Sequence, residues 1–376
     1  MTIDSFTLHR VRLELVSPFR TSFGSQSTRD LILIEATDGD VAGWGECVAM
    51  AEPRYSPEFV DGAWQVISQF LAPALLAEVH LTAYDVQRVL APFKGHRMAK
   101  AALEMAVLDA ELRLRDQSFA DFLGASGKSV PSGVSIGIMD DIESLLEVVG
   151  GFLNEGYQRI KLKIEPGWDI EPVRAVRERF GDIPLQVDAN TAYSLQDAAH
   201  LARLDEFDLL LIEQPLDEED LVQHAELAKR LRTPVCLDES ITSAKAAADA
   251  IALGACTIVN IKPGRVGGYL EARRIHDLCQ AHGLPVWCGG MLETGIGRAA
   301  NAALAALPGF TVVGDLSASD RFYREDLTEP FVLEDGGLRV PTGAGFGVVP
   351  DAGRLAAATV ETTRIDRPVS VGAGLS

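Results

Sequence analysis

Short apolar runs alternate with longer helical segments through the second half of the chain. The runs begin 23 to 28 residues apart and occupy residues 132–138, 157–164, 185–190, 209–215, 234–240, 257–263, 285–290 and 311–317. Strands that alternate with helices and lack hairpin turns pair in parallel through crossover connections. Eight nearly equal repeats therefore predict an α/β fold with a closed (β/α)8-type barrel, although an open parallel sheet is also compatible with the pattern.

The first 128 residues follow a different pattern. Alternating apolar and polar positions predict strands at residues 5–16, 30–39 and 41–48. Helical spacing predicts helices at residues 56–76 and 97–117. We therefore expect an α+β unit over residues 1–128 and the barrel over residues 129–317. The tail, residues 318–376, combines Pro and Gly with short apolar pieces, and we expect it to fold back onto the N-terminal unit.

Composition and charge exclude several classes of protein. A net charge of −20 argues against binding to nucleic acid or to an anionic membrane surface, because phosphate contacts require clustered Lys and Arg. The five cysteines are scattered and form no C-x-x-C pair, which argues against a disulfide framework. The N-terminus reads as a strand rather than a signal peptide, and no apolar run is long enough to span a membrane. We expect a cytoplasmic protein.

The segment Arg159–Ile164 reads RIKLKI and alternates basic with apolar residues, which is the periodicity of a strand. Lys161 and Lys163 therefore share one face of that strand. Two ammonium groups on one face repel each other, so either that face lies in water or an anionic group lies opposite. The residues that end the following runs favour the second explanation.

Acidic residues end three consecutive runs. Asp188, Glu213 and Asp238 follow one another at intervals of 25 residues, so each takes the same place in its repeat. A single such residue is ordinarily a helix cap, but three carboxylates at a barrel mouth repel one another unless they are protonated or hold a cation. Because no His or Cys stands at these places, the pattern predicts an all-oxygen site for Mg²⁺ or Mn²⁺.

A cation between lysines suits the removal of a proton next to a carboxylate group. That reaction forms an enediolate with two negative charges, which a dication and the ammonium of Lys161 can stabilise. The base must be a neutral amine, and a lysine near a metal and another lysine can have its pKa lowered to roughly 7–8. Lys262 ends the sixth run, across the barrel from Lys161 and Lys163, and can return a proton from the opposite face.

Several longer segments carry a specific resemblance that covers essentially the whole chain: PFRTSFG, HRMAKAALEMAVLDAE, RIKLKI, LQVDAN, LIEQP, CLDES, NIKPGRVGG, WCGGMLETGIGRAANAALA and GDLSASDRFY. They resemble the enolase superfamily, its muconate-lactonizing subgroup and, within that subgroup, the o-succinylbenzoate synthase / N-succinylamino acid racemase family. The resemblance implies a (β/α)7β modified TIM barrel with an α+β capping domain, which the N-terminal part and the tail form together.

The resemblance also implies roles for the residues of the barrel mouth. It assigns the metal to the three acidic residues at the run ends, the acid/base pair to Lys163 and Lys262, and stabilisation of the enediolate to Lys161. Two reactions on a small carboxylate substrate are implied. One is syn dehydration to o-succinylbenzoate, a step toward menaquinone in which Lys163 is both base and acid. The other is racemisation of N-succinyl or other N-acylamino acids by the two lysines from opposite faces.

Other functions remain open on the same residues. A dipeptide epimerase or a cycloisomerase of the same subgroup would share the metal and the lysines. A Schiff-base aldolase barrel would use Lys163 or Lys262 as a nucleophile and need no metal. A non-catalytic barrel is disfavoured, since a scaffold has no reason to bury unpaired charges.

A second group of residues is expected around the substrate. The segment Pro18–Gly24 resembles the family's mobile lid loop. Residues at run ends and in this loop are expected to line the substrate pocket, with core packing as the alternative for several of them: Phe19, Phe23, Met50, Ser135, Asn190, Met291 and Leu292. We expect Glu239 to orient a lysine or a metal ligand, and Arg265 to lower the pKa of Lys262. Assemblies are common in the family, which implies a homo-oligomer.

Overall fold

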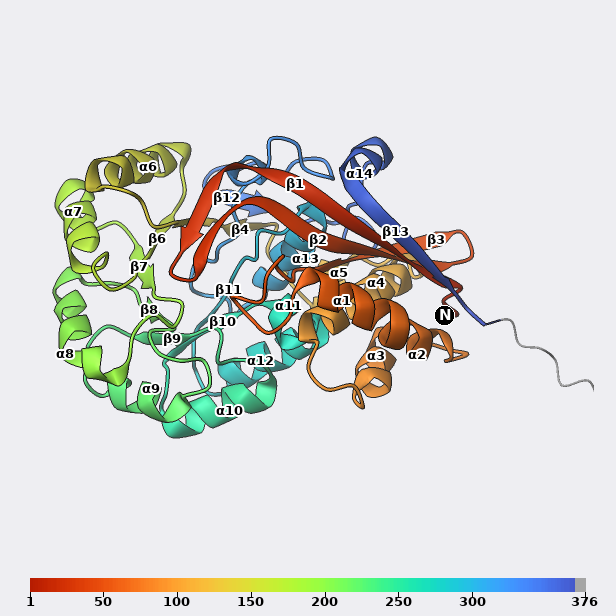
Figure 1. Ribbon diagram of the computed structural model, residues 1–376, viewed down its shortest axis with the longest axis horizontal. Helices are drawn as coiled ribbons and strands as arrows, with labels where there is room; N and C mark the ends of the chain where they lie inside the picture. Colours follow the sequence, from red (N-terminus) through yellow and green to blue (C-terminus); the bar gives the residue numbers. More distant parts are fainter. Residues whose placement is uncertain (369–376) are drawn as a thin grey trace, which may run out of the picture.

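The computed structural model describes residues 1–368, which form two units packed against each other (Figure 1). The first unit, here called the cap, is built on an antiparallel sheet of strand order β13-β1-β2-β3. Its strands are β1 (Ser5–Thr21), β2 (Gly24–Asp38), β3 (Val41–Cys47) and β13 (Thr359–Asp366). Because β13 pairs antiparallel with β1, the end of the tail lies on the N-terminal sheet.

The helices of the cap follow its first three strands. They are α1 (Val60–Val66), α2 (Ala72–Leu76), α3 (Ala83–Leu90), α4 (Arg97–Leu114) and α5 (Phe119–Leu123). A π-helical segment joins α1 to α2, so the helix predicted over residues 56–76 is shorter and lies in three pieces. The helix α4 packs on β3 and on the barrel helix α11. Gly43 and Gly45 of β3 permit this contact, since a Cβ at either position would overlap the backbone of α4.

The second unit is a parallel sheet of seven strands that curls into a barrel (Figure 1). Its strands in chain order are β5 (Gly133–Ile136), β6 (Arg159–Lys163), β7 (Leu185–Asp188), β8 (Ile212–Glu213), β9 (Val235–Leu237), β10 (Ile258–Ile261) and β11 (Val286–Cys288). Each strand pairs with the strand that follows it in the sequence, as crossover connections require. The first seven runs predicted from the sequence therefore form this sheet.

Helices cover the outside of the barrel sheet. They are α6 (Ile142–Glu155), α7 (Ile170–Phe180), α8 (Ala198–Leu201), α9 (Leu221–Ala228), α10 (Ala244–Leu253), α11 (Pro263–Val266), α12 (Tyr269–Ala281) and α13 (Gly295–Ala305). The tail adds α14 (Ala352–Ala358) and the short strand β12 (Gly337–Arg339), which pairs with β4 (Ser129–Pro131). Within residues 1–368, no helix combines the length and the apolar character needed to cross a bilayer.

The eighth predicted run, residues 311–317, is not a regular strand. Its backbone bonds to both edges of the sheet: the amide of Gly133 donates to the carbonyl of Gly314 at 2.9 Å, and the amide of Asp315 donates to Cys288 at 3.0 Å. A Cβ at Gly314 would lie 2.6 Å from the Cys288 carbonyl oxygen, so the segment runs too close to β11 for an ordinary strand. The segment nevertheless joins the two edges, and the predicted fold class is confirmed.

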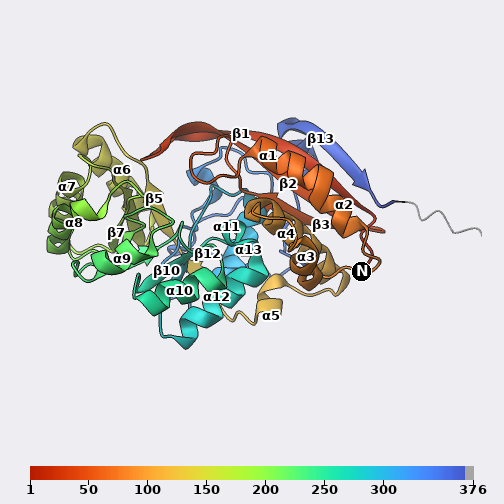
Figure 2. The same ribbon diagram turned by 60° about the horizontal axis from the view of Figure 1, so that its bottom comes forward.

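The cap places one long hairpin over the barrel. The strands β1 and β2 extend beyond the rest of the cap sheet, and their turn lies above the barrel strands in both views (Figures 1 and 2). The hydroxyl of Ser22 donates to the carbonyl of Asn190 at 3.2 Å, and the amide of Ile138 donates to Arg20 at 3.0 Å. The domain boundaries at residues 128 and 318 stay a prediction.

Candidate active site

The register of the barrel strands brings the predicted acidic and basic residues to one end of the sheet. Lys163 of β6 lies opposite Asp188 of β7, and Asp188 lies opposite Glu213 of β8. Asp238 follows directly after β9, the next strand in the sheet. The three carboxylates are completely buried, so each needs a cation or several hydrogen bonds close by.

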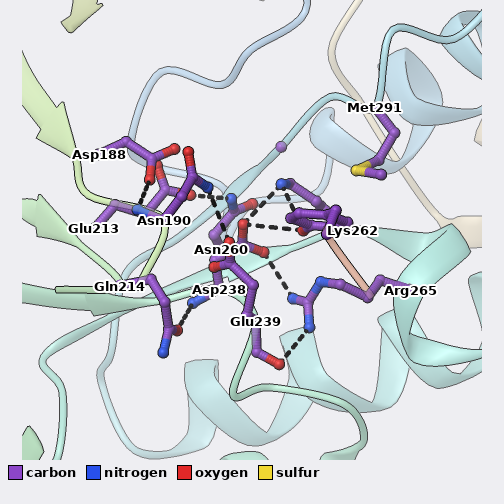
Figure 3. A network of polar contacts seen from close by, with 12 residues as sticks. Asp188, Asn190, Glu213, Gln214, Asp238, Glu239, Asn260, Lys262, Arg265 and Met291 are labelled. Carbon is purple, nitrogen blue, oxygen red and sulfur yellow. Dashed lines mark hydrogen bonds and ion pairs between the residues drawn. The ribbon is translucent and has the colours of Figure 1, made fainter. Parts of the chain in front are cut away.

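Cations of the chain itself meet these carboxylates. Lys163 donates to Asp188 at 2.6 Å. Lys161 lies 2.9 Å from Glu213 and 3.2 Å from Asp188. On the opposite wall, Lys262 donates to Asp238 at 2.7 Å (Figure 3). The lysines of β6 therefore face carboxylates rather than water, as the acidic run ends indicate.

Ion pairing sets the pKa values in the site. Burial acts to lower the pKa of Lys262, but Asp238 and Tyr55 raise it well above its ordinary value. Burial also opposes the charge on Lys161, yet its carboxylate neighbours raise its pKa. Burial and the charge of Asp188 raise the pKa of Glu213. The pKa values of Lys161 and Lys262 are raised because each ammonium pairs directly with a carboxylate.

The outer residues Glu239 and Arg265 each contact a member of the site. The side-chain nitrogen of Asn190 donates to Glu239 at 2.9 Å and the Asn190 side-chain oxygen accepts from Lys163 at 2.6 Å, so Asn190 connects Glu239 to Lys163. Arg265 donates to Asp238 at 2.7 Å and to the backbone carbonyl of Glu239 at 2.9 Å (Figure 3). Arg265 thus balances the charge of the carboxylate that Lys262 also contacts.

A cavity of about 300 Å³ lies between the cap and the barrel mouth. Lys163 and Lys262 line it together with six of the seven residues expected around a substrate: Phe19, Phe23, Met50, Asn190, Met291 and Leu292. The aromatic residues come from the β1–β2 hairpin, so the cavity has an apolar cover above a charged floor. A cavity with convergent polar groups in an apolar lining is typical of a small-molecule site.

Ser135 lies apart from this cavity. It lines a smaller one of about 40 Å³, together with Lys161, Arg298 and Asp315. The Ser135 side chain is buried, and within the described residues its hydroxyl has no hydrogen-bond partner. Lys163 and Lys262 line both cavities, so the two spaces adjoin.

The sequence analysis missed three polar residues of the site. Tyr55, from a cap loop, accepts from Lys262 at 3.0 Å and donates to Asp238 at 3.4 Å. Asn260 donates to Glu213 at 2.6 Å. Asp315 lies 2.5 Å from Lys161 and 2.8 Å from Arg159. Asp315 follows an apolar run, as the three expected carboxylates do, and this signal could have revealed it; the loop of Tyr55 offers no such periodicity.

Backbone strain concentrates at the strand ends that form the site. Asn190, Gln214 and Leu292 have positive φ angles of 40°, 37° and 56°, in a region that residues with side chains seldom adopt. They follow β7, β8 and β11, and Gln214 is held by the amide of Asp238, which donates to its side chain at 3.0 Å. Strained residues that surrounding bonds fix in place are frequent at functional sites.

The carboxylates do not form a ready metal cage. Within residues 1–368, no group of three or more His, Cys, Asp or Glu side chains is arranged so that it could hold a metal ion. The reason is visible in the ion pairs, since the oxygens turn toward the ammonium groups of Lys161, Lys163 and Lys262. The three predicted metal ligands are therefore buried oxygen donors whose partners are lysines, and the metal site stays a prediction.

Comparisons with known proteins agree with this arrangement. Residues 3–124 match the family described as "Mandelate racemase / muconate lactonizing enzyme, N-terminal domain", and residues 145–354 match "Enolase C-terminal domain-like". An N-succinylamino acid racemase from an Amycolatopsis species is 68% identical over 93% of this chain and 95% of that protein. An o-succinylbenzoate synthase from Geobacillus stearothermophilus is 48% identical over 92% of this chain and 93% of that protein.

A solved structure supports the same assignment. The crystal structure of an enolase superfamily member from Listeria innocua is 40% identical to this chain, and the match covers 98% of this chain and 100% of that one with a TM-score of 0.94. This chain thus combines a barrel, a cap and polar residues at the strand ends, and it is similar along nearly its whole length to named enzymes. The chain is an enzyme of the enolase superfamily and belongs to its family of o-succinylbenzoate synthases and N-succinylamino acid racemases.

Proposed function

We propose that this enzyme removes the proton next to the carboxylate group of a small substrate, and that it uses this step for o-succinylbenzoate synthesis, for racemisation of N-succinylamino acids, or for both. One observation carries the proposal: Lys163 and Lys262 reach a single cavity from opposite walls of the barrel, with buried carboxylates behind them. The names of the similar proteins from Amycolatopsis and Geobacillus support both reactions.

The residues of the site fit a divalent cation such as Mg²⁺ or Mn²⁺. Asp188, Glu213 and Asp238 would hold it, because their oxygens are buried, come from neighbouring strands and include no nitrogen or sulfur ligand. The lysine ammonium groups that now meet these oxygens would give them up. When bound, the cation would stabilise the second negative charge that the substrate carboxylate gains as its proton leaves.

The lysines carry the proton transfers. In its neutral form, the Nζ atom of Lys163 takes the α-proton and becomes an ammonium, while the substrate becomes an enediolate. In racemisation, the ammonium of Lys262 returns a proton to the opposite face of the same carbon. In dehydration, the Lys163 ammonium gives its proton to the departing hydroxyl group, which leaves as water. Asn190 holds the Lys163 amine, and Tyr55 holds the Lys262 amine.

The remaining residues prepare the substrate for this step. The Lys161 ammonium adds positive charge beside the carboxylate on which the enediolate charge develops. Phe19, Phe23 and Met50 cover the cavity from the cap and exclude water, which strengthens the attraction between the charges inside.

Parallel kinetics of the purified protein would test the proposal. The substrates are the cyclohexadiene precursor of o-succinylbenzoate and a series of N-succinyl and N-acetyl amino acids, each measured before EDTA, after EDTA and after added Mg²⁺. We expect at least one activity that EDTA abolishes and Mg²⁺ restores. Activity that persists without metal, or a covalent adduct trapped by borohydride with a carbonyl substrate, would favour the aldolase instead.

A further inference from the structure

The strand β6 sends three cations into the barrel, and the deepest pair shares one carboxylate. Arg159 and Lys161 are fully or almost fully buried, and both meet Asp315, from the irregular segment that joins the sheet edges. Lys161 Nζ lies 2.5 Å from Asp315, and Arg159 lies 2.8 Å from the other carboxylate oxygen. Asp315 therefore stands between two buried cations.

Asp315 pairs with an arginine whose own position is fixed. The Arg159 guanidinium donates to the carbonyl of Val313 at 2.9 Å and 3.1 Å and to that of Val134 at 3.3 Å, so its position is set by the backbone on both sides. The face of the Trp287 ring lies 4.7 Å from Lys161 Nζ and 5.5 Å from the Arg159 guanidinium. The Asp315 carboxylate thus pairs with a guanidinium that the backbone holds in place.

Lys161 has three carboxylate partners, but only two of them are proposed metal ligands. Two of them, Glu213 and Asp188, are the oxygens that would turn to a divalent cation under the proposed function. Once they do so, Lys161 loses both partners and faces a repelling dication. Asp315 lies on the irregular segment that joins the sheet edges, and it is not one of the proposed metal ligands. It would therefore stay with Lys161 and Arg159 while a cation binds to the other two carboxylates.

We propose that Asp315 is a positioning residue, which holds the Lys161 ammonium in place so that Asp188 and Glu213 are free to bind the metal. The inference rests on the proposed function and adds a residue that acts through Lys161. Without Asp315, Lys161 would stay on the metal ligands and compete with the cation. The same loss would leave Lys161 badly placed to stabilise the enediolate, which lowers kcat more than it changes KM.

A double-mutant cycle on Mg²⁺ binding, without substrate, tests this role. The variants are Asp315→Asn, Lys161→Met and the two combined, and calorimetric titration with MgCl₂ gives their affinities. We expect Asp315→Asn to weaken Mg²⁺ binding about 10-fold, as outer partners of metal ligands commonly do. In the Lys161→Met background the same change should have little effect. An equal loss in both backgrounds would overturn the proposal, because it would indicate only the loss of a distant negative charge.

A matched control separates positioning from general loss of structure. Asp109 of α4 is also a buried aspartate paired with an arginine, at 2.9 Å from Arg113, but it lies in the cap. Asp109→Asn should change neither the Mg²⁺ affinity nor kcat, whereas Asp315→Asn should lower kcat roughly 10- to 100-fold at a nearly constant KM. Comparable losses in the two variants would contradict the specific role of Asp315.

Two further measurements keep the outcome decisive. If Asp315→Asn does not fold, Arg159→Met combined with Asp315→Asn removes the buried charge pair as a unit, and the cycle is repeated with that pair; unchanged Mg²⁺ affinity would overturn the proposal. The unmutated protein separates this proposal from the proposed function. Absence of Mg²⁺ binding there would overturn both, while Mg²⁺-dependent activity with an additive cycle would overturn the role of Asp315 alone.

Discussion

Buried carboxylates occur in both units of the molecule, but their partners differ. In the cap, Glu104 accepts from the amide of Leu270 at 3.0 Å, and Glu46 accepts from the amides of Thr294 and Gly297, each at 3.0 Å. These amides belong to the first turns of the barrel helices α12 and α13. In the barrel, the buried carboxylates meet lysine ammonium groups instead.

The difference in partners distinguishes carboxylates that join the two units from carboxylates of the proposed active site. Backbone amides at a helix start are fixed dipoles, so Glu46 and Glu104 fasten the cap to the barrel through partners that cannot move away. Burial raises the pKa of Glu104 to about 8 and that of Glu46 to about 7, so burial favours the neutral form of both groups. Lysine side chains can move and change charge, so under the proposed function the barrel carboxylates would exchange them for a metal.

The largest effect should follow from the removal of a mobile partner. Lys163→Ala deletes the proposed base and should lower both dehydration and racemisation by about 10³- to 10⁴-fold or more. Steady-state kinetics with both kinds of substrate measures it. Lys245→Ala, on an exposed lysine of α10, is the control and should change neither rate. Substantial activity in Lys163→Ala would contradict the role of Lys163 as the base, and with it the view that the lysine partners of the barrel carboxylates are the groups that act.

Lys262→Ala tests the opposite wall of the cavity. Racemisation should fall by about 10²- to 10⁴-fold, because no amine remains to serve the second face. Exchange of the α-proton with D₂O, followed by NMR, should continue for the one enantiomer whose proton faces Lys163. Robust racemisation by Lys262→Ala, or exchange of both enantiomers, would overturn the two-base assignment.

A smaller effect is expected at a proposed metal ligand. Asp238→Asn removes one charged oxygen and leaves Lys262 and Arg265 without their shared carboxylate. Mg²⁺ affinity should fall by at least about 100-fold, since even outer partners of ligands commonly cost 10- to 100-fold. Calorimetric titration measures the change, with Asp109→Asn as the control that keeps its affinity. If Asp238→Asn bound Mg²⁺ as the unmutated protein does, Asp238 would not be a ligand.

The same contrast explains how much could be predicted from the sequence. The barrel mouth was predictable because each repeat delivers its last residue to the same edge, so Asp188, Glu213 and Asp238 had to be neighbours. The cap sheet and α4 were predictable from periodicity. The irregular eighth segment was not, because its close approach at Gly314 depends on packing against β11 rather than on any local pattern.

Contacts between the units were also beyond prediction. Tyr55 enters the site from a cap loop, and its partner Lys262 lies 207 residues further along the chain. Glu46 and Glu104 carry no sequence signal for the helix starts that they meet in the other unit. The sequence likewise does not predict which lysine pairs with which carboxylate, because several pairings would balance the same charges. Sequence spacing therefore predicts which residues one sheet brings together, whereas contacts between the two units depend on how the units pack against each other.

The last prediction concerns the fixed partners and measures stability rather than activity. Burial raises the pKa of Glu104 from 4.5 to about 8 in the folded protein. Between these values the unfolded chain is ionised while the folded protein keeps its proton, so this group's contribution to stability is present below pH 4.5 and is lost as the pH rises to about 8. Glu104→Gln cannot ionise, and should be close in stability to the unmutated protein near pH 5 but more stable at pH 8, by roughly 3 to 4 kcal/mol.

Urea unfolding at pH 5, 6, 7 and 8 would measure this difference, with Glu218→Gln as an exposed control that should leave the pH profile unchanged. The free energies of unfolding of Glu104→Gln and the unmutated protein should diverge steadily across this range. Parallel profiles would mean that Glu104 ionises normally when folded, and hence that amides at a helix start stabilise its charge as fully as water does. Glu104 would then be ionised at neutral pH, and only the kind of partner, backbone amide or lysine, would still distinguish it from the barrel carboxylates that lysines contact.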